Sequence, residues 1–155
     1  MGDKVVYPMH GAGVIERIEY KDLRGTSEPY YILHLPVGGM FVMLPEGSAG
    51  EVGLRPVIPA EEVPSVFGVL SARDEVEAQA WNRRYRANME RLRQGRVEEV
   101  ARIVRDLARR ERLKGLSTGE RKMLDNARAI LVSELALSIG CSEGEAEELI
   151  NAALA

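Results

Sequence analysis

A basic segment that contains tryptophan has the clearest potential chemistry in this sequence. The stretch AWNRRYRANMERLR, at positions 80–93, holds the only tryptophan of the chain and five arginines. In a helix, Trp81, Arg84 and Asn88 would fall at i, i+3 and i+7, with Arg91 at i+10. The spacing therefore predicts one helical stripe in which an indole ring lies beside basic and amide groups.

The surface around this stripe is expected to be broadly basic, because Arg83 and Arg86 project from other positions of the same helix. Arginines neutralise DNA phosphates, and a flat apolar side chain can wedge against bases where a duplex is bent or opening. Tryptophan is also a largely buried residue in folded proteins. Spacing alone leaves both interpretations of Trp81 open, a DNA wedge or a core residue.

No pattern in the rest of the sequence predicts catalysis or metal binding. The two histidines and the single cysteine, His10, His34 and Cys141, lack the spacing of metal ligands. The segment 11–13 (GAG) lacks the third glycine of a dinucleotide-binding loop and is expected to be a tight turn. Carboxylates are expected on solvent-facing sides of helices, so no acid/base pair is predicted. We therefore expect a binding module without metal or cofactor rather than an enzyme.

The charge of the chain is unevenly distributed along the sequence. Residues 1–70 carry 5 Lys/Arg and 9 Asp/Glu, residues 71–133 carry 16 and 10, and residues 134–155 carry none and 5. A basic middle between acidic ends indicates a polyanionic partner for the middle alone. The alternative is a solvated pair of helices whose charges form salt bridges with one another.

Cysteine content and hydropathy indicate a cytoplasmic protein. The chain has one cysteine, which cannot form an internal disulfide, so a reducing compartment is expected. The N-terminus does not resemble a signal peptide, and no apolar run reaches the roughly 18 residues that a membrane helix needs.

The first part of the chain has the pattern of a small β domain, and the second part that of helices. Strands are predicted over 4–7, 14–20, 30–35, 40–44 and near 54–58, separated by Gly and Pro. Short strands at near-regular spacing indicate a small barrel or a strongly bent sheet with an open edge. From Glu61 onward the period becomes helical. The predicted domains are 1–58 and 59–155.

Five helices are predicted in the second domain, and two of them have clear start signals. They are expected over 63–70, 77–92, 97–113, from Ser117 to about Ser138, and from Ser142 onward. The last two begin with capping boxes, in which a serine is followed three residues later by a glutamate. Their inward residues are expected to be Met123, Leu124, Ala127, Ile130, Leu131 and Leu135 in one helix, and Ala146, Leu149, Ile150 and Ala153 in the other.

Several segments together resemble the CarD/CdnL family of bacterial transcription regulators. Residues 3–13 (DKVVYPMHGAG) resemble the family's opening, and residues 81–88 (WNRRYRAN) resemble its W-x-x-R-Y-x-x-N helix. Further similar segments are VRDL at 104–107, GLS at 115–117, ERKML at 120–124 and LVSELA at 131–136. The resemblance runs in order from about residue 2 to residue 136.

This resemblance implies an α+β protein of two domains, a small Tudor-like or SH3-like bent sheet followed by an all-α bundle. It implies that the first domain binds the β subunit of RNA polymerase, and that Lys21 and Met43 match positions used for that contact. The family has arginine in some members where this chain has Met43, so the contact here would be more apolar. No cofactor is implied.

The resemblance also implies that the second domain meets promoter DNA near the −10 element. Trp81 would lodge in the minor groove at the upstream edge of the transcription bubble and stabilise the open complex. Arg84 and Arg86 match basic positions that support DNA contact, and Arg83 and Asn88 lie in the same motif. We expect a monomeric protein that is located in the cytoplasm and associated with the nucleoid.

Two other functions remain open from the sequence. The chain could be a protein-interaction adaptor whose basic helices serve only packing and ion pairs. It could also be an autonomous nucleic-acid binder, but a net charge of +6 over residues 71–133 is moderate, and no helix-turn-helix signature is present.

Overall fold

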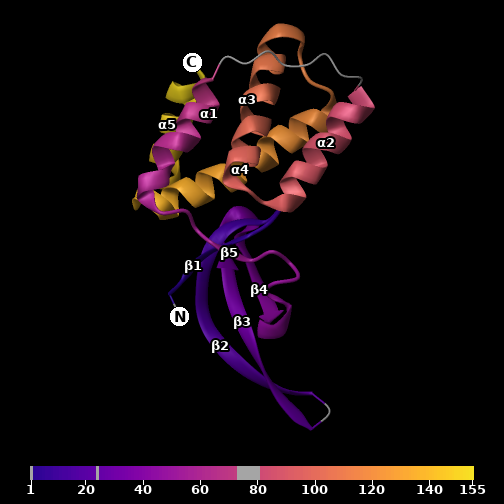
Figure 1. Ribbon diagram of the computed structural model, residues 1–155, viewed down its shortest axis with the longest axis vertical. Helices are drawn as coiled ribbons and strands as arrows, with labels where there is room; N and C mark the ends of the chain where they lie inside the picture. The colour runs from indigo at the N-terminus through magenta and orange to yellow at the C-terminus, as the bar shows by residue number, and fades with distance from the viewer. Residues whose placement is uncertain (1, 24, 73–80) are drawn as a thin grey trace.

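An antiparallel sheet and a bundle of helices, joined end to end, make up the molecule (Figure 1). The computed structural model describes residues 2–23, 25–72 and 81–155, with the backbone alone at Leu23, Trp81 and Asn82. The predicted fold class, a bent sheet followed by helices, is confirmed. None of the described helices combines the length and apolarity that crossing a membrane requires.

The sheet has five strands in the order β4-β3-β2-β1-β5, and every neighbouring pair is antiparallel. The strands are β1 (Lys4–Tyr7), β2 (Gly11–Leu23), β3 (Thr26–Leu35), β4 (Met40–Pro45) and β5 (Arg55–Pro56). The β2–β3 hairpin is longer than predicted and extends away from the helices (Figure 1). The register of β2 against β3 shifts between Ile15 and Arg17, a bulge that bends the strand.

The GAG segment was wrongly predicted to be a turn, because it forms the first three residues of β2. Gly11 to Gly13 pair with Tyr7 to Val5 of β1, and the turn lies just before them. A Cβ built on Gly13 would lie 2.0 Å from the carbonyl oxygen of His34 on β3. Glycine is therefore needed at position 13 for close approach of two strands.

The helices are α1 (Val63–Ser71), α2 (Trp81–Gln94), α3 (Val97–Lys114), α4 (Thr118–Ile139) and α5 (Glu143–Leu154). Both predicted N-caps are confirmed. Ser117 accepts a hydrogen bond from the Glu120 amide, and Ser142 accepts one from the Glu145 amide. Each cap satisfies a backbone N–H group that the first turn of a helix leaves without a partner.

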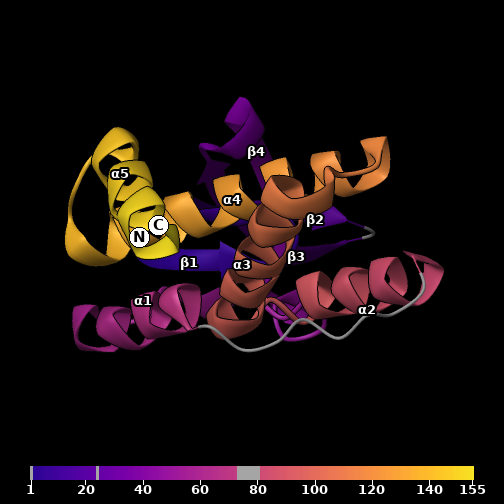
Figure 2. The same cartoon turned by 90° about the horizontal axis from the view of Figure 1, so that it is seen from above.

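The helical core forms where α3 and α4 cross, with α1 and α2 on either side of α3 (Figure 2). All six inward residues predicted on α4 are buried. Leu149 on α5 was predicted inward, but it is 44% exposed. The helix is anchored instead by Ala146 and Ile150, which are four residues apart and completely buried.

Two carboxylates on α4 contradict the prediction that acidic side chains lie only on solvent-facing surfaces. Glu120 and Glu134 are each 2% exposed. A buried carboxylate is costly unless it is paired and hydrogen-bonded. Each of these glutamates therefore needs a cationic partner, and the two partners determine how the molecule is held together.

Candidate nucleic-acid interface

The described structure of α2 begins at Trp81, at the end of the bundle that lies far from the sheet (Figure 1). The predicted orientation of the Trp81 ring concerns a side chain outside the described residues. Arg83 and Arg86 are exposed on this helix. Across the part of the chain that the structure describes, neither guanidinium has an ion pair. Two cationic groups are thus presented to solvent within the first two turns of α2.

Arg84 points toward the bundle and pairs with Glu120 of α4. Its Nε donates to Glu120 Oε2 at 2.7 Å, and its Nη2 donates to Oε1 at 2.9 Å. The Arg84 side chain is 11% exposed and that of Glu120 is 2% exposed. A planar guanidinium fits a carboxylate in this two-bonded manner, which fixes direction as well as distance. The pair therefore holds the first turns of α2 against the start of α4.

The electrostatics of this pair favour the charged state of both groups. The hydrogen bond and charge of Arg84 hold the pKa of Glu120 below its usual value, against the opposing effect of burial. Arg110 adds a second positive charge, with its Nε 3.9 Å from Glu120 Oε1. Ser117, the N-cap of α4, also lies 3.5 Å from the same oxygen. Glu120 thus remains ionised while it is buried.

Asn88 is also directed into the bundle. It is 4% exposed, and its Oδ1 accepts a hydrogen bond from Arg91 Nη1 at 3.4 Å. Arg91 also pairs with Glu99 of α3 at 3.4 Å. The predicted stripe of Arg84, Asn88 and Arg91 therefore faces α3 and α4.

A second stripe of α2 carries the exposed charge. Arg83, Arg86, Glu90 and Arg93 follow one another at i, i+3, i+7 and i+10, and all four are exposed. Arg93 lies 3.6 Å from Glu90, a surface pair of little energetic weight. The charge of this stripe is most positive toward the Trp81 end of the helix, where Arg83 and Arg86 stand without an intervening acid.

The two positions predicted to contact RNA polymerase lie on one face of the sheet. Met43 of β4 pairs with Ile32 of β3, which pairs with Arg17 of β2. Lys21 lies four residues beyond Arg17 on β2, and side chains alternate along a strand, so Lys21 shares the face of Met43. Lys21 is exposed and Met43 is 48% exposed. β4 is the outermost strand on its side of the sheet, so its outer edge is unpaired among the described residues.

Two protein-family models match the chain and together cover nearly all of it. Residues 1–58 match the CarD-like/TRCF RID domain, and residues 65–151 match the C-terminal domain of CarD. The chain belongs to the CarD family. A similar relative is the protein named "Putative transcription factor YdeB" of Bacillus subtilis (strain 168), which is 36% identical over 143 residues. That match covers 92% of this chain and 94% of the relative.

Membership of the CarD family confirms the resemblance that the sequence motifs carry. CarD proteins are non-enzymatic transcription factors, so the prediction that this chain is not an enzyme is confirmed as well. The predicted DNA and polymerase contacts of individual residues stay predictions.

Sequence reasoning missed three charged residues of this CarD protein that organise its tertiary structure: Arg55, Glu120 and Glu134. A signal for the two glutamates was present. The inward stripe of α4 includes Leu124, Ala127 and Ile130, and it extends to Glu120 and Glu134 at four-residue steps from its ends. An acid that continues an apolar stripe is a candidate for a buried ion pair. Arg55 lies in a two-residue strand and carried no comparable signal.

Proposed function

We propose that this CarD protein docks on the β subunit of RNA polymerase through its sheet and stabilises the open promoter complex through the start of α2. Trp81 would wedge into the minor groove near the −10 element, at the upstream edge of the bubble. The observation that carries the proposal is that Arg83 and Arg86 are exposed in the first two turns of α2, the helix that begins at Trp81 at the outer end of the bundle. Arginine at such a position can neutralise phosphates beside a wedge.

Some residues of α2 would contact DNA, and others would hold the helix in position. Arg83 and Arg86 are assigned to the phosphates because their side chains are exposed. Arg84 and Asn88 stay predictions as DNA contacts, and their burial and hydrogen bonds support a role in positioning the helix. The two hydrogen bonds from Arg84 to Glu120 and the burial of Asn88 would hold α2 in place against the bundle when Trp81 meets the bases.

Docking would use the face and edge of the sheet near β4. Lys21 supplies a positive charge and Met43 an apolar contact on one face. The unpaired edge of β4 suits addition of a strand from the polymerase, since backbone hydrogen bonds then contribute much of the affinity. Once docked, α2 would meet DNA at high effective concentration, so strong affinity for free DNA is not required.

The effect on transcription would follow from a difference in contact between two promoter states. Wedging favours the open complex only if Trp81 contacts it better than the closed complex. A difference of about 1.4 kcal/mol would change the ratio of the two states tenfold.

The test is a Trp81→Ala variant assayed with RNA polymerase holoenzyme on promoter DNA. We expect polymerase affinity to stay at the wild-type value and the gain in open-complex lifetime to disappear. Leu113→Ala, a change at an 81% exposed residue of α3, is a control for loss of a large apolar side chain outside both α2 and the docking sheet. Lifetimes for Trp81→Ala equal to those of the wild type would refute the wedge.

A protein-interaction adaptor is the second candidate, and the ion pairs within the bundle favour it. Arg84 and Arg91 are directed to Glu120 and Glu99, so part of the basic character of α2 is used in packing. An adaptor would bury the Trp81 ring and leave promoter complexes unchanged. Acrylamide quenching of tryptophan fluorescence distinguishes the two, because a wedge must be accessible in the free protein.

A further inference from the structure

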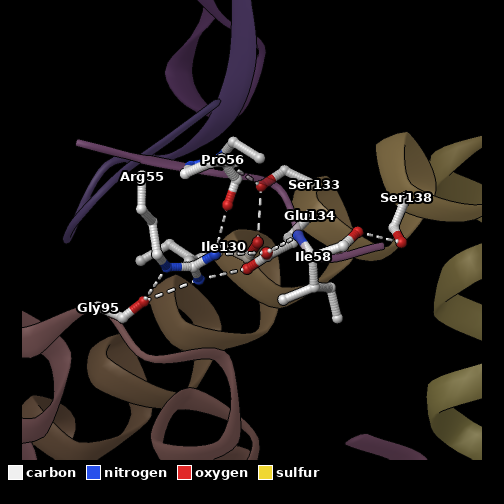
Figure 3. A network of polar contacts seen from close by, with 9 residues as sticks. Arg55, Pro56, Ile58, Gly95, Ile130, Ser133, Glu134 and Ser138 are labelled. Atoms are coloured by element: carbon white, nitrogen blue, oxygen red, sulfur yellow. Dashed lines mark hydrogen bonds and ion pairs between the residues drawn. The ribbon is translucent and has the colours of Figure 1, made fainter. Parts of the chain in front are cut away.

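Arg55 joins three parts of the molecule through a single guanidinium (Figure 3). It lies on β5, at the end of the sheet next to the helices. Its Nη1 and Nη2 donate to the two carboxylate oxygens of Glu134 on α4, each at 2.7 Å. Its Nε and Nη2 donate to the carbonyl oxygen of Gly95, directly after α2, at 3.0 and 2.8 Å.

Most of the hydrogen-bonding groups of the Arg55 and Glu134 side chains are engaged at this junction. The fifth N–H of Arg55, on Nη1, donates to the Pro56 carbonyl at 3.0 Å, so all five donors of the guanidinium are engaged. Glu134 Oε2 accepts a further bond from the Ile58 amide at 3.0 Å. Lysine could not reproduce this fork, since its donors radiate from one point. The network therefore sets an angle between the sheet, α2 and α4.

Neighbouring residues of α4 extend the contact along one face of the helix. Ser133 accepts a hydrogen bond from the Ala12 amide of β2 at 2.9 Å, and Ser138 donates to the Ile58 carbonyl at 2.7 Å. The carbonyl of Leu137 accepts a bond from Lys4 Nζ of β1 at 3.0 Å. These bonds are directional, so they resist sliding that a purely apolar contact would permit.

The junction between the sheet and the helices is closely packed. A Cβ on Gly95 would lie 2.8 Å from the Pro8 side chain, in the turn between β1 and β2. A Cβ on Gly11 would lie 3.1 Å from Ser133 Oγ. The space bounded by Pro8, Arg55, Gly95 and Glu134 is too small to admit a water molecule.

We propose that the network of Arg55, Glu134 and Gly95 is an orientation lock, with Arg55 and Glu134 as positioning residues for DNA contact by α2. The lock fixes the direction of α2 relative to the sheet, so that docking of the sheet places the Trp81 end of α2 at one point. This inference rests on the proposed function. A loose joint would spread that end over a large volume and lower its effective concentration at the DNA.

The first measurement is the distance distribution between the domains in the free protein. Spin labels at Glu51→Cys, on the sheet side, and Glu90→Cys, on α2, in a Cys141→Ser background report this distance. Both labelled positions are exposed. We expect one narrow distribution for the otherwise wild-type protein, a broader one for Glu134→Gln and for Arg55→Lys, and no change for Glu147→Gln. Glu147 pairs with Arg128 at the surface, so the last variant makes the same chemical change outside the lock. A broad wild-type distribution would overturn the proposal even if both lock variants failed to fold.

The second measurement separates orientation from docking and from the wedge itself. For unlabelled Glu134→Gln and Arg55→Lys we expect polymerase affinity within about twofold of the wild type, and a gain in open-complex lifetime reduced about tenfold. Glu147→Gln should keep the full gain. The lock is refuted if a variant with a broadened distance distribution keeps the full gain in open-complex lifetime. It is also refuted if both variants fold and neither changes the distance distribution. If Trp81→Ala keeps the gain, it is the proposed function that fails, while the distance measurement still decides whether the lock exists.

Discussion

Glu120 and Glu134 lie fourteen residues apart on nearly the same face of α4, and each forms an ion pair with an arginine from another element. At 1.5 Å per residue the two carboxylates are separated by about 21 Å along the helix axis. Glu120 binds Arg84 near the start of α2, and Glu134 binds Arg55, which also bonds to Gly95 at the end of α2. α4 thus holds α2 at both ends and the sheet at one.

Loss of the Glu120 carboxylate should destabilise the fold far more than loss of a surface pair. Glu120→Ala leaves the guanidinium of Arg84 buried without its main partner, which costs about 3 kcal/mol in free energy of unfolding. Urea denaturation measures this loss. Glu111→Ala removes the exposed pair of Glu111 with Arg121 and should cost less than about 1 kcal/mol. Equal losses in the two variants would contradict a buried role for Glu120.

The stability of the protein should depend on pH through Glu120 in the acid range. Arg84 lowers the pKa of Glu120 from its ordinary value of 4.5 in the folded state. The unfolded chain then binds the proton more readily, so the contribution is fully present above pH 4.5 and is lost as the pH falls through the lowered pKa. Free energies of unfolding from pH 6 downward should fall less steeply for Glu120→Gln than for the wild type. Parallel curves would show that the folded-state pKa is not lowered.

Removal of the exposed arginines of α2 should impair DNA contact without affecting the fold. Arg86→Ala and Arg83→Ala should each change stability by less than about 0.5 kcal/mol, because both side chains are exposed. Each should shorten the open-complex lifetime. Each should also reduce the dependence of that lifetime on salt concentration, by the amount expected for loss of about one phosphate contact. Lifetimes measured over a range of salt concentrations test this. Arg102→Ala, at a half-exposed position on α3, is the matched control and should leave both quantities unchanged.

A charge on the exposed face of β4 should weaken docking on RNA polymerase. Met43→Glu places a carboxylate where an apolar contact is proposed, and we expect polymerase affinity to fall at least about tenfold, or about 1.4 kcal/mol. Leu113→Glu makes the same kind of change at an 81% exposed position on α3 and should have no effect. Direct binding measurements with purified polymerase distinguish the two variants. Equal affinity of Met43→Glu and the wild type would move the docking surface elsewhere.

Glycine to alanine substitutions should have opposite effects at two positions. Gly95 has a φ of +72° and no room for a Cβ beside Pro8. Gly95→Ala should therefore lower the free energy of unfolding by about 1–3 kcal/mol. Gly68 lies inside α1, where a Cβ would meet no other atom within 4 Å, so Gly68→Ala should raise stability by about 0.5–1 kcal/mol. Calorimetry of both variants checks the signs. A stable Gly95→Ala protein would show that the junction has room to adjust.

The local elements of this protein were largely predictable from its sequence. The strands at positions 4–7 and 40–44 and the helix starts after Ser117 and Ser142 were predicted close to their observed bounds. Alternation, helical period and capping boxes are signals that a few neighbouring residues carry by themselves. The family followed from motifs spread in order along the chain, which the matches to both CarD models confirm.

Tertiary structure decided which charged residues are structural and which are free to bind. Trp81, Arg84, Asn88 and Arg91 share one stripe by spacing, but spacing cannot say which side of α2 meets the bundle. The side of α2 that meets the bundle carries Arg84, and its partner Glu120 is 36 residues away in the chain. The segment from Gly11 to Gly13, which was predicted to be a turn, likewise lies in a strand that pairs with β1. Sequence determined the segments and the family, whereas the partners of buried charges depend on contacts between distant segments, which local patterns do not encode.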